Sequence, residues 1–270
     1  YGVAQSCGKN AEKIQVEWGQ QIDPEAVRAK LCEGGFDTVT LVHNETSTGV
    51  MNDLTGIAAV VKEFPDVLLV VDTVSSLSAV PIEMDKLGID VVLAGVQKAL
   101  ALPPGLAVFA ISEAALERAS TTEGRGYYFD FVEFDKNAAK NNTPSTPAVS
   151  LLYALKQKVD SIMEEGLEAR YARHENLNKM IHAWMEKHGF KNFAPEGHQS
   201  KSLTAIDNSD GRLDVTAFIK ALRAKYNVLI NGGYGKIKGT TFRISNMGNE
   251  TEETMQELID QLDDVIADFL

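Results

Sequence analysis

The stretch Leu68-Leu69-Val70-Val71-Asp72 decides the fold, together with Val91-Val92-Leu93-Ala94 and the residues Gly95-Val96-Gln97-Lys98 that follow it. Both apolar runs are short and rich in β-branched side chains, which is typical of buried parallel strands. Each run delivers a charged residue, Asp72 or Lys98, at or just beyond its carboxyl end. Ligands of open α/β sheets bind at that edge, so the sequence predicts that a carboxylate and a lysine meet in one site.

This pair of residue types suits a Schiff-base cofactor that contains a pyridine ring. The lysine would hold the aldehyde, and the acid would pair with the pyridinium nitrogen. The alternative for Lys98 is a strand-end lysine that extends to solvent, and for Asp72 it is a turn or helix-capping residue. Lys98 is followed by Ala-Leu-Ala-Leu, and a lysine in such a buried region needs a partner or a lowered pKa.

Between residues 36 and 112, short apolar runs alternate with helical stretches. This alternation predicts right-handed βαβ units, and therefore an α/β fold with a mainly parallel sheet flanked by helices. The predicted elements are strands at Val39–Val42, Val67–Val71, Val91–Ala94 and Leu106–Ile111, and a helix at Asp53–Glu63.

The pattern changes in the second half of the chain. We expect a polar surface excursion at residues 121–142, followed by a helical pattern from Pro147 to His188 with a break at Gly166. Further on, the predicted elements are strands near 202–206, 228–230 and 241–245, and helices at 215–226 and from Thr251. We therefore expect a large domain over residues 1–171 and a smaller α+β domain over residues 172–270.

The composition excludes several classes of partner. A formal net charge of -12 and a pI of about 4.9 argue against nucleic acid and anionic membranes. Cys7 and Cys32 fit no metal or redox spacing, and so few cysteines favour a reduced, cytoplasmic setting. No segment approaches the roughly 18 apolar residues of a membrane span, and Tyr1–Ser6 is not a signal peptide. We expect a cytoplasmic protein without a metal site.

Two further motifs carry chemistry. His43-Asn44-Glu45-Thr46-Ser47-Thr48-Gly49 follows a predicted strand, and its hydroxyl groups suit either a cofactor or an ordinary loop and helix cap. Arg243 follows Thr240-Thr241-Phe242. Its planar guanidinium could form a bidentate contact with an α-carboxylate, and the alternative is a solvent-facing strand residue. Asn231–Gly239 is glycine-rich but does not lead from a strand into a helix, as a dinucleotide-binding loop requires.

Taken together, these motifs resemble class V pyridoxal-phosphate aminotransferases, in particular the alanine–glyoxylate and serine–pyruvate group. The matching segments, in family order, are His43–Gly49, Val71–Ser76, Gly95–Leu100 with Pro103-Pro104-Gly105, Thr143–Pro147 and Phe242–Ile244. Asn44 stands where the family often has glycine, and Thr143 stands where many relatives carry tyrosine. The resemblance covers essentially the whole chain and implies a fold-type I enzyme.

The resemblance also implies individual roles. Lys98 would carry pyridoxal 5'-phosphate and act as the general base, and Arg243 would hold the substrate carboxylate. The implied cofactor residues are Thr46 near the ring hydroxyl, Asp72 at the pyridine nitrogen, Val74 on the ring face, Gln97 at the phosphate, and Thr143 and Thr146 at the phosphate of a neighbouring subunit. Sharing of the last two residues implies a homodimer.

The implied activity is ping-pong transfer of an amino group from alanine or serine to glyoxylate or pyruvate. The alternatives are an aminophosphonate transaminase or a pyridoxal-phosphate lyase on the same scaffold, and a truncated, non-catalytic structural partner. Family members carry a glycine- and serine-rich phosphate loop and a ring-stacking aromatic before the position of Tyr1. We therefore expect that the chain lacks an N-terminal segment and that these 270 residues alone bind the cofactor weakly.

Overall fold

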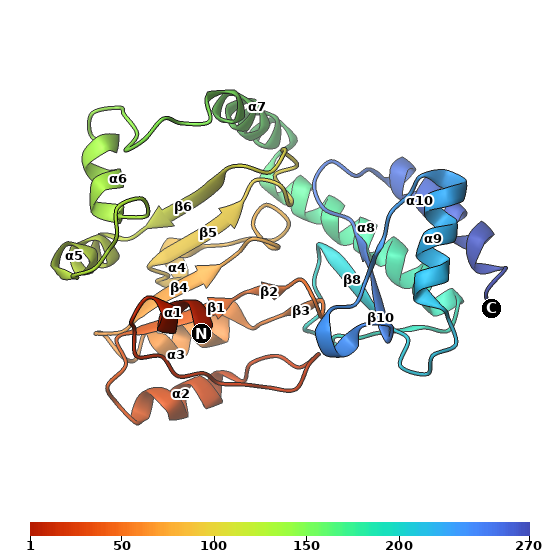
Figure 1. Ribbon diagram of the computed structural model, residues 1–270, viewed down its shortest axis with the longest axis horizontal. Helices are drawn as coiled ribbons and strands as arrows, with labels where there is room; N and C mark the ends of the chain where they lie inside the picture. The colour runs from red at the N-terminus through yellow and green to blue at the C-terminus, as the bar shows by residue number, and fades with distance from the viewer.

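A four-stranded sheet in the order β1-β4-β5-β6 forms the centre of the larger of two lobes (Figure 1). The computed structural model describes residues 1–270. Strands β1 (Thr38–Val42), β4 (Leu68–Asp72) and β5 (Val91–Gly95) are parallel, and β6 (Ala107–Ile111) runs antiparallel to β5. The mainly parallel α/β sheet predicted from the sequence is therefore confirmed.

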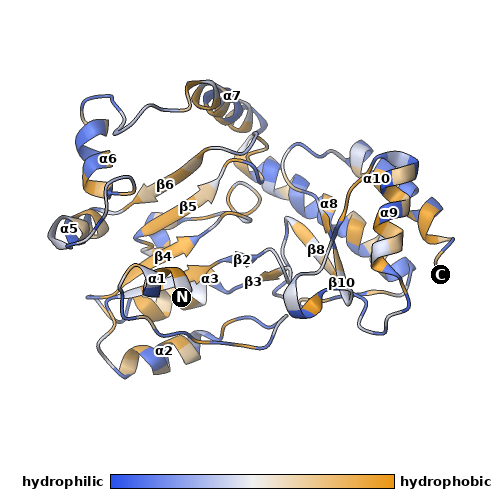
Figure 2. Cartoon of the chain, viewed as in Figure 1, coloured by the Kyte–Doolittle hydropathy of each residue, from blue (hydrophilic) through white to orange (hydrophobic).

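Two helices, α2 (Pro24–Cys32) and α3 (Leu54–Val61), pack on one face of this sheet. Because they cover one face, β4 buries alternate residues such as Leu69 and Val71 rather than its whole length. Figure 2 shows the strands as a largely hydrophobic layer. No helix in the structure combines the length and the apolar composition needed to cross a membrane.

The remaining elements of the larger lobe surround the sheet (Figure 1). They are α1 (Gly2–Ser6), β2 (Asn44–Glu45), β3 (Val50–Met51), α4 (Met84–Leu87), α5 (Glu113–Thr121), α6 (Phe131–Ala138) and α7 (Val149–Glu165). Helix α6 lies inside the stretch predicted to be a surface excursion, so that prediction missed a helix. Asp130 caps α6 by accepting a hydrogen bond from the Val132 N–H at 3.0 Å and also pairs with Arg125.

The smaller lobe is an antiparallel sheet in the order β7-β8-β10-β9, covered by helices. Its elements are α8 (Leu167–Lys187), β7 (Lys191–Asn192), β8 (Leu203–Asp207), α9 (Val215–Tyr226), β9 (Asn231–Gly232), the short 3-10 helix η1 (Gly235–Ile237), β10 (Thr241–Ser245) and α10 (Glu252–Ile266). The prediction of a strand near residues 228–230 is wrong. Pairing with β10 begins at Asn231, and Leu229 before it is 63% exposed.

Helix α8 joins the two lobes. It begins after Gly166, whose φ of +84° ends α7, so the predicted break at this glycine is confirmed. Near its start, Arg170 contacts the larger lobe, whereas Leu177 and Ile181 lie in the core of the smaller lobe. The expected domain boundary at residues 171/172 falls within this helix.

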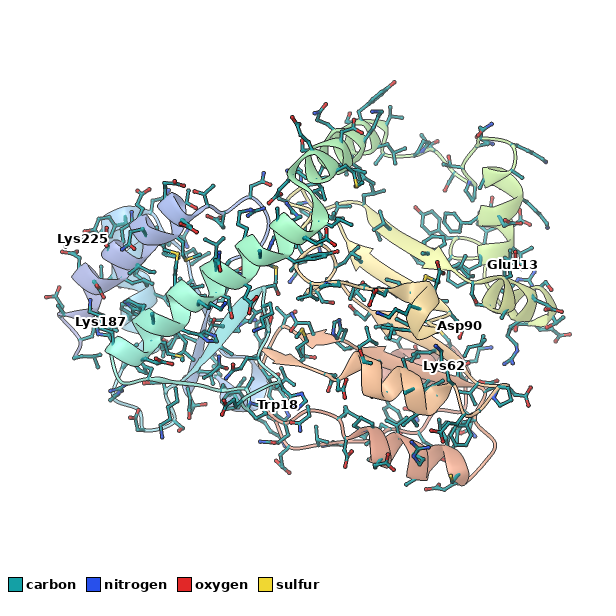
Figure 3. The ribbon with its side chains drawn as sticks, turned by 180° about the vertical axis from the view of Figure 1, so that it is seen from behind. Trp18, Lys62, Asp90, Glu113, Lys187 and Lys225 are labelled. Atoms are coloured by element: carbon teal, nitrogen blue, oxygen red, sulfur yellow. The ribbon has the colours of Figure 1, made fainter.

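The segment before α2 also reaches the smaller lobe. A Cβ placed on Gly19 would lie 2.9 Å from Phe193 Cε1, and one placed on Gly235 would lie 3.2 Å from Trp18 Cη2. Trp18 is seen at the junction of the two lobes in Figure 3. The early part of the chain thus contacts the loop that leads to β10.

Candidate functional site

A cavity of about 700 Å³ lies between the lobes. Its lining includes Thr46, Gln97 and Lys98 from the larger lobe and Tyr234 and Arg243 from the smaller lobe. Four residues singled out in the sequence, from segments far apart along the chain, therefore meet in one cavity. Asp72, at the end of β4, and Val74 after it are not lining residues of this cavity. Thr143 and Thr146 do not line it either and lie in an exposed loop before α7.

Lys98 lies on a tight turn after β5. The Ala101 N–H donates to the Lys98 carbonyl oxygen at 2.8 Å, and the Leu102 N–H donates to the Val96 carbonyl oxygen at 3.0 Å. The side chain of Lys98 is half-buried, and its amino group forms no hydrogen bond or ion pair. It is therefore a free amine that faces a cavity.

Asp72 ends β4 at the same edge of the sheet. It pairs with Leu93 of β5, and its Oδ1 accepts a hydrogen bond from the Val74 N–H at 2.8 Å. This bond fixes the carboxylate, while Oδ2 has no partner within the protein. The carboxylate can therefore accept one further hydrogen bond from a ligand.

Thr46 forms a hydroxyl pair with Ser75, with the two oxygen atoms 2.5 Å apart. Ser75 lies in the Val71–Ser76 motif, but no role could be assigned to it from the sequence. The Ser75 carbonyl oxygen accepts hydrogen bonds from Asn44 Nδ2 at 3.1 Å and from the Ser202 hydroxyl at 2.6 Å. Because Ser202 belongs to the smaller lobe, this network links the two walls of the cavity.

His43 lies behind this hydroxyl pair and is buried. Its Nδ1 is 2.9 Å from the Ser76 hydroxyl oxygen. Burial lowers the pKa of His43 to about 4, so the ring is neutral at pH 7. The buried position suits a structural role for this histidine, which the sequence alone left open.

Arg243 projects from β10 and is only 6% exposed. Its Nη1 donates to the Thr46 carbonyl oxygen at 2.9 Å, and its Nε and Nη2 donate to the Gly232 carbonyl oxygen at 3.3 and 3.1 Å. A guanidinium carries five N–H donors, so two remain for a ligand. Arg243 is thus held from both lobes and is not the solvent-facing strand residue of the alternative interpretation.

A buried arginine supports the turn that carries Lys98. Arg170 donates to the Ala99 carbonyl oxygen and to the Ser78 hydroxyl, both at 2.6 Å, and pairs with Glu165 at 2.8 Å. Arg170 could not be singled out from the sequence, because its contacts join a helix to loops far away along the chain.

His174 lies one helical turn beyond Arg170. Its Nδ1 is 2.9 Å from the Arg170 carbonyl oxygen, and its Nε2 accepts a hydrogen bond from the Gly248 N–H at 3.2 Å. Nδ1 therefore carries the proton of a neutral ring. Burial is the main reason that the pKa of His174 is lowered to about 4.

We expect acid to destabilise the protein partly through His174. Its folded-state pKa of about 4 lies below the ordinary histidine pKa of 6.5, so the unfolded chain binds the extra proton between these values. The stabilisation is complete above about pH 6.5 and is lost as the pH falls through about 4, at a cost of roughly 3 kcal/mol. Urea unfolding of wild type and His174→Gln across this range should give a shallower pH dependence for the variant. Equal slopes would contradict the assignment.

Comparison with known proteins identifies the family. The family model described as "Aminotransferase class-V" matches residues 1–258. The chain belongs to the class V aminotransferase family. It is 41% identical over 241 residues to an uncharacterised aminotransferase of Methanocaldococcus jannaschii, covering 88% of this chain and 62% of that protein. It is 35% identical over 249 residues to the serine–glyoxylate aminotransferase of Arabidopsis thaliana, covering 90% and 62%.

A solved structure gives the same result. The alanine–glyoxylate aminotransferase from Nostoc sp. superposes with a TM-score of 0.92 at 30% identity, covering 98% of this chain and 71% of that one. The fold-type I architecture implied by the sequence motifs is therefore confirmed. The chain spans about 62% of the length of each of the two sequence relatives.

Class V aminotransferases depend on pyridoxal phosphate, and the residues at this cavity and at the carboxyl end of β4 fit that cofactor. The unpaired amine of Lys98 suits an aldehyde, and the free oxygen of Asp72 suits a pyridinium N–H. Gln97 lines the same cavity and offers an amide donor for a phosphate oxygen. The roles assigned to these residues from the sequence remain predictions.

Proposed function

We propose that the protein is a pyridoxal-phosphate-dependent aminotransferase that moves an amino group from alanine or serine to glyoxylate or pyruvate. The observation that carries the proposal is an unpaired lysine and a buried arginine with two free N–H groups in one cavity. The names of two similar proteins, a serine–glyoxylate and an alanine–glyoxylate aminotransferase, support the choice of substrates.

Each residue has a distinct task in this proposal. Lys98 binds the cofactor through its amine and then moves the proton at the substrate α-carbon. Asp72 keeps the ring nitrogen protonated, and in that state the bound cofactor supplies an electron sink. Arg243 orients the substrate by its carboxylate through a charge-assisted pair.

Three further residues hold the cofactor in place. The Thr46 hydroxyl, which pairs with the Ser75 hydroxyl, contacts a substituent of the pyridine ring. Val74 lies two residues after Asp72 and packs against the ring face. Gln97 contacts the phosphate.

We also infer a homodimer, in which Thr143 and Thr146 of one subunit reach the phosphate in the other. Both threonines are exposed and do not line the cavity of their own chain. The Thr143 hydroxyl donates to the Ser145 carbonyl oxygen at 2.7 Å, which holds the loop in shape while leaving the hydroxyl oxygen free to accept. These positions suit contact with a second copy of the chain.

A donor panel with the purified protein and added pyridoxal phosphate tests the activity. Serine and alanine, each with glyoxylate, should yield glycine together with the corresponding 2-oxo acid. Pyruvate and ammonia formed from serine without glyoxylate would indicate a lyase, and turnover of 2-aminoethylphosphonate alone would indicate an aminophosphonate transaminase. Absence of cofactor binding would favour the non-catalytic partner.

A further inference from the structure

Tyr234 covers one face of the Arg243 guanidinium. Its ring centroid lies 4.1 Å from Arg243 Cζ, a distance typical of a cation–π contact. The side chain is 55% exposed and lines the cavity. The residues that precede it include Gly232, whose carbonyl oxygen accepts two hydrogen bonds from the same guanidinium. The short segment from Gly232 to Tyr234 therefore contacts the Arg243 guanidinium both through hydrogen bonds at its edge and through an aromatic ring on its face.

The backbone around Tyr234 is tightly built. A Cβ on Gly233 would lie 2.1 Å from the Ile237 carbonyl oxygen, so the turn excludes a side chain at that position. The Ile237 N–H donates to the Tyr234 carbonyl oxygen at 2.9 Å, and Ile237 is buried. Trp18 packs against Gly235, since a Cβ placed on this glycine would lie 3.2 Å from Trp18 Cη2. These contacts fix the position from which the tyrosine ring extends.

Charged side chains of both signs line the cavity. The cations that line it are Lys98 and Arg243, both near Tyr234. Its acids are Glu250 and Glu257, and neither forms an ion pair with the protein. A substrate with two carboxylates would find one free guanidinium, because the lysine is committed to the cofactor. Its second carboxylate would meet an aromatic ring or unpaired acids.

We propose that Tyr234 is a specificity-determining residue that restricts the amino donor to small amino acids with a single carboxylate. The proposal rests on the proposed role of Arg243 as the carboxylate site. The ring occupies the space over the guanidinium face, and backbone carbonyl groups occupy three of its five N–H donors. One small carboxylate fits the two that remain, whereas a bulky side chain would collide with the ring.

The first test compares donors. Wild type should prefer serine and alanine to aspartate by about 100-fold or more in kcat/KM, because the second carboxylate is left unpaired. Tyr234→Ala should accept leucine at least about tenfold better than wild type, and Tyr234→Phe should keep the size limit. A donor profile unchanged in Tyr234→Ala would overturn the proposal.

The second test needs no catalysis, because Tyr234 and a bound carboxylate share one guanidinium. Arg243 first, and then Lys98, lower the pKa of the Tyr234 phenol. Tyr226, Glu250 and Glu257 are the other ionisable groups of the cavity lining. Acetate bound at Arg243 should raise the Tyr234 pKa, and phenol ionisation should weaken acetate binding by the same factor.

Phenolate absorbance measured as wild type minus Tyr234→Phe reports this ionisation directly. Acetate should shift that difference curve to higher pH, whereas chloride at equal ionic strength should not. The matched control is Tyr153→Phe, which removes an exposed phenol on α7 outside the cavity. The difference curve of wild type minus Tyr153→Phe should not shift when acetate is added. Failure of acetate to shift the Tyr234 curve overturns the proposal. A shift without any transamination would overturn only the proposed function.

Discussion

Replacing Lys98 with Ala should abolish covalent attachment of pyridoxal phosphate and lower transamination by at least about 10³-fold. Lys98 is the one lysine that lines the cavity, and its amino group has no partner in the protein. The variant loses both the attachment point and the base. Borohydride reduction of the cofactor-loaded wild type, followed by peptide mass mapping, should find the pyridoxyl group on the peptide that contains Gln97-Lys98.

Lys158 provides a matched control for this experiment. Like Lys98 it is half-buried, and burial lowers its pKa. It donates a hydrogen bond to Asn249 Oδ1 at 2.8 Å and does not line the cavity. Lys158→Ala should therefore keep both the cofactor and the activity. An adduct on Lys158, or on any lysine other than Lys98, would refute the assignment.

The sequence predicted the part of the site that local patterns encode. Apolar runs that end in Asp72 and lead to Lys98 indicated strand ends, and parallel pairing brings such ends to one edge of a sheet. The hydrophobic pattern around Arg243 likewise predicted β10. In each case the deciding information lies within a few residues of the functional side chain.

Contacts between distant segments could not be predicted in this way. Tyr234 lay in a glycine-rich loop, without a role of its own, and its place on Arg243 depends on the pairing of β9 with β10. Arg170 reaches Ala99 across 71 positions, so no local pattern relates them. Helix α6 was missed because it is short and its apolar side depends on a distant contact, the packing of Phe131 and Phe134 on Phe109 of β6. The individual roles came from the family resemblance, since spacing alone does not distinguish a ligand from a cap.

Replacing Arg243 with Ala should raise KM for the amino donor by about 30-fold to 1,000-fold, since truncating one partner of a desolvated charge pair costs about 2–5 kcal/mol. Arg243→Lys should recover only part of the loss, because a lysine keeps the charge but not the planar fork. Steady-state kinetics with serine as the varied donor measures both effects. A donor KM within about twofold of wild type would show that Arg243 has another task.

The hydrogen bonds of Arg243 to Thr46 and Gly232 require a second comparison, because their loss could loosen the contact between the lobes. Arg212→Ala is the matched control, since its guanidinium also stacks on an aromatic ring, at 3.9 Å from the Phe190 centroid, but lies outside the cavity. If Arg243 acts on the substrate, its loss raises the donor KM while the cofactor dissociation constant and the urea midpoint change as little as in Arg212→Ala. If Arg243 has a purely structural role, Arg243→Ala should instead weaken cofactor binding and lower the urea midpoint together. Arg243→Lys should then restore cofactor binding, the urea midpoint and the donor KM.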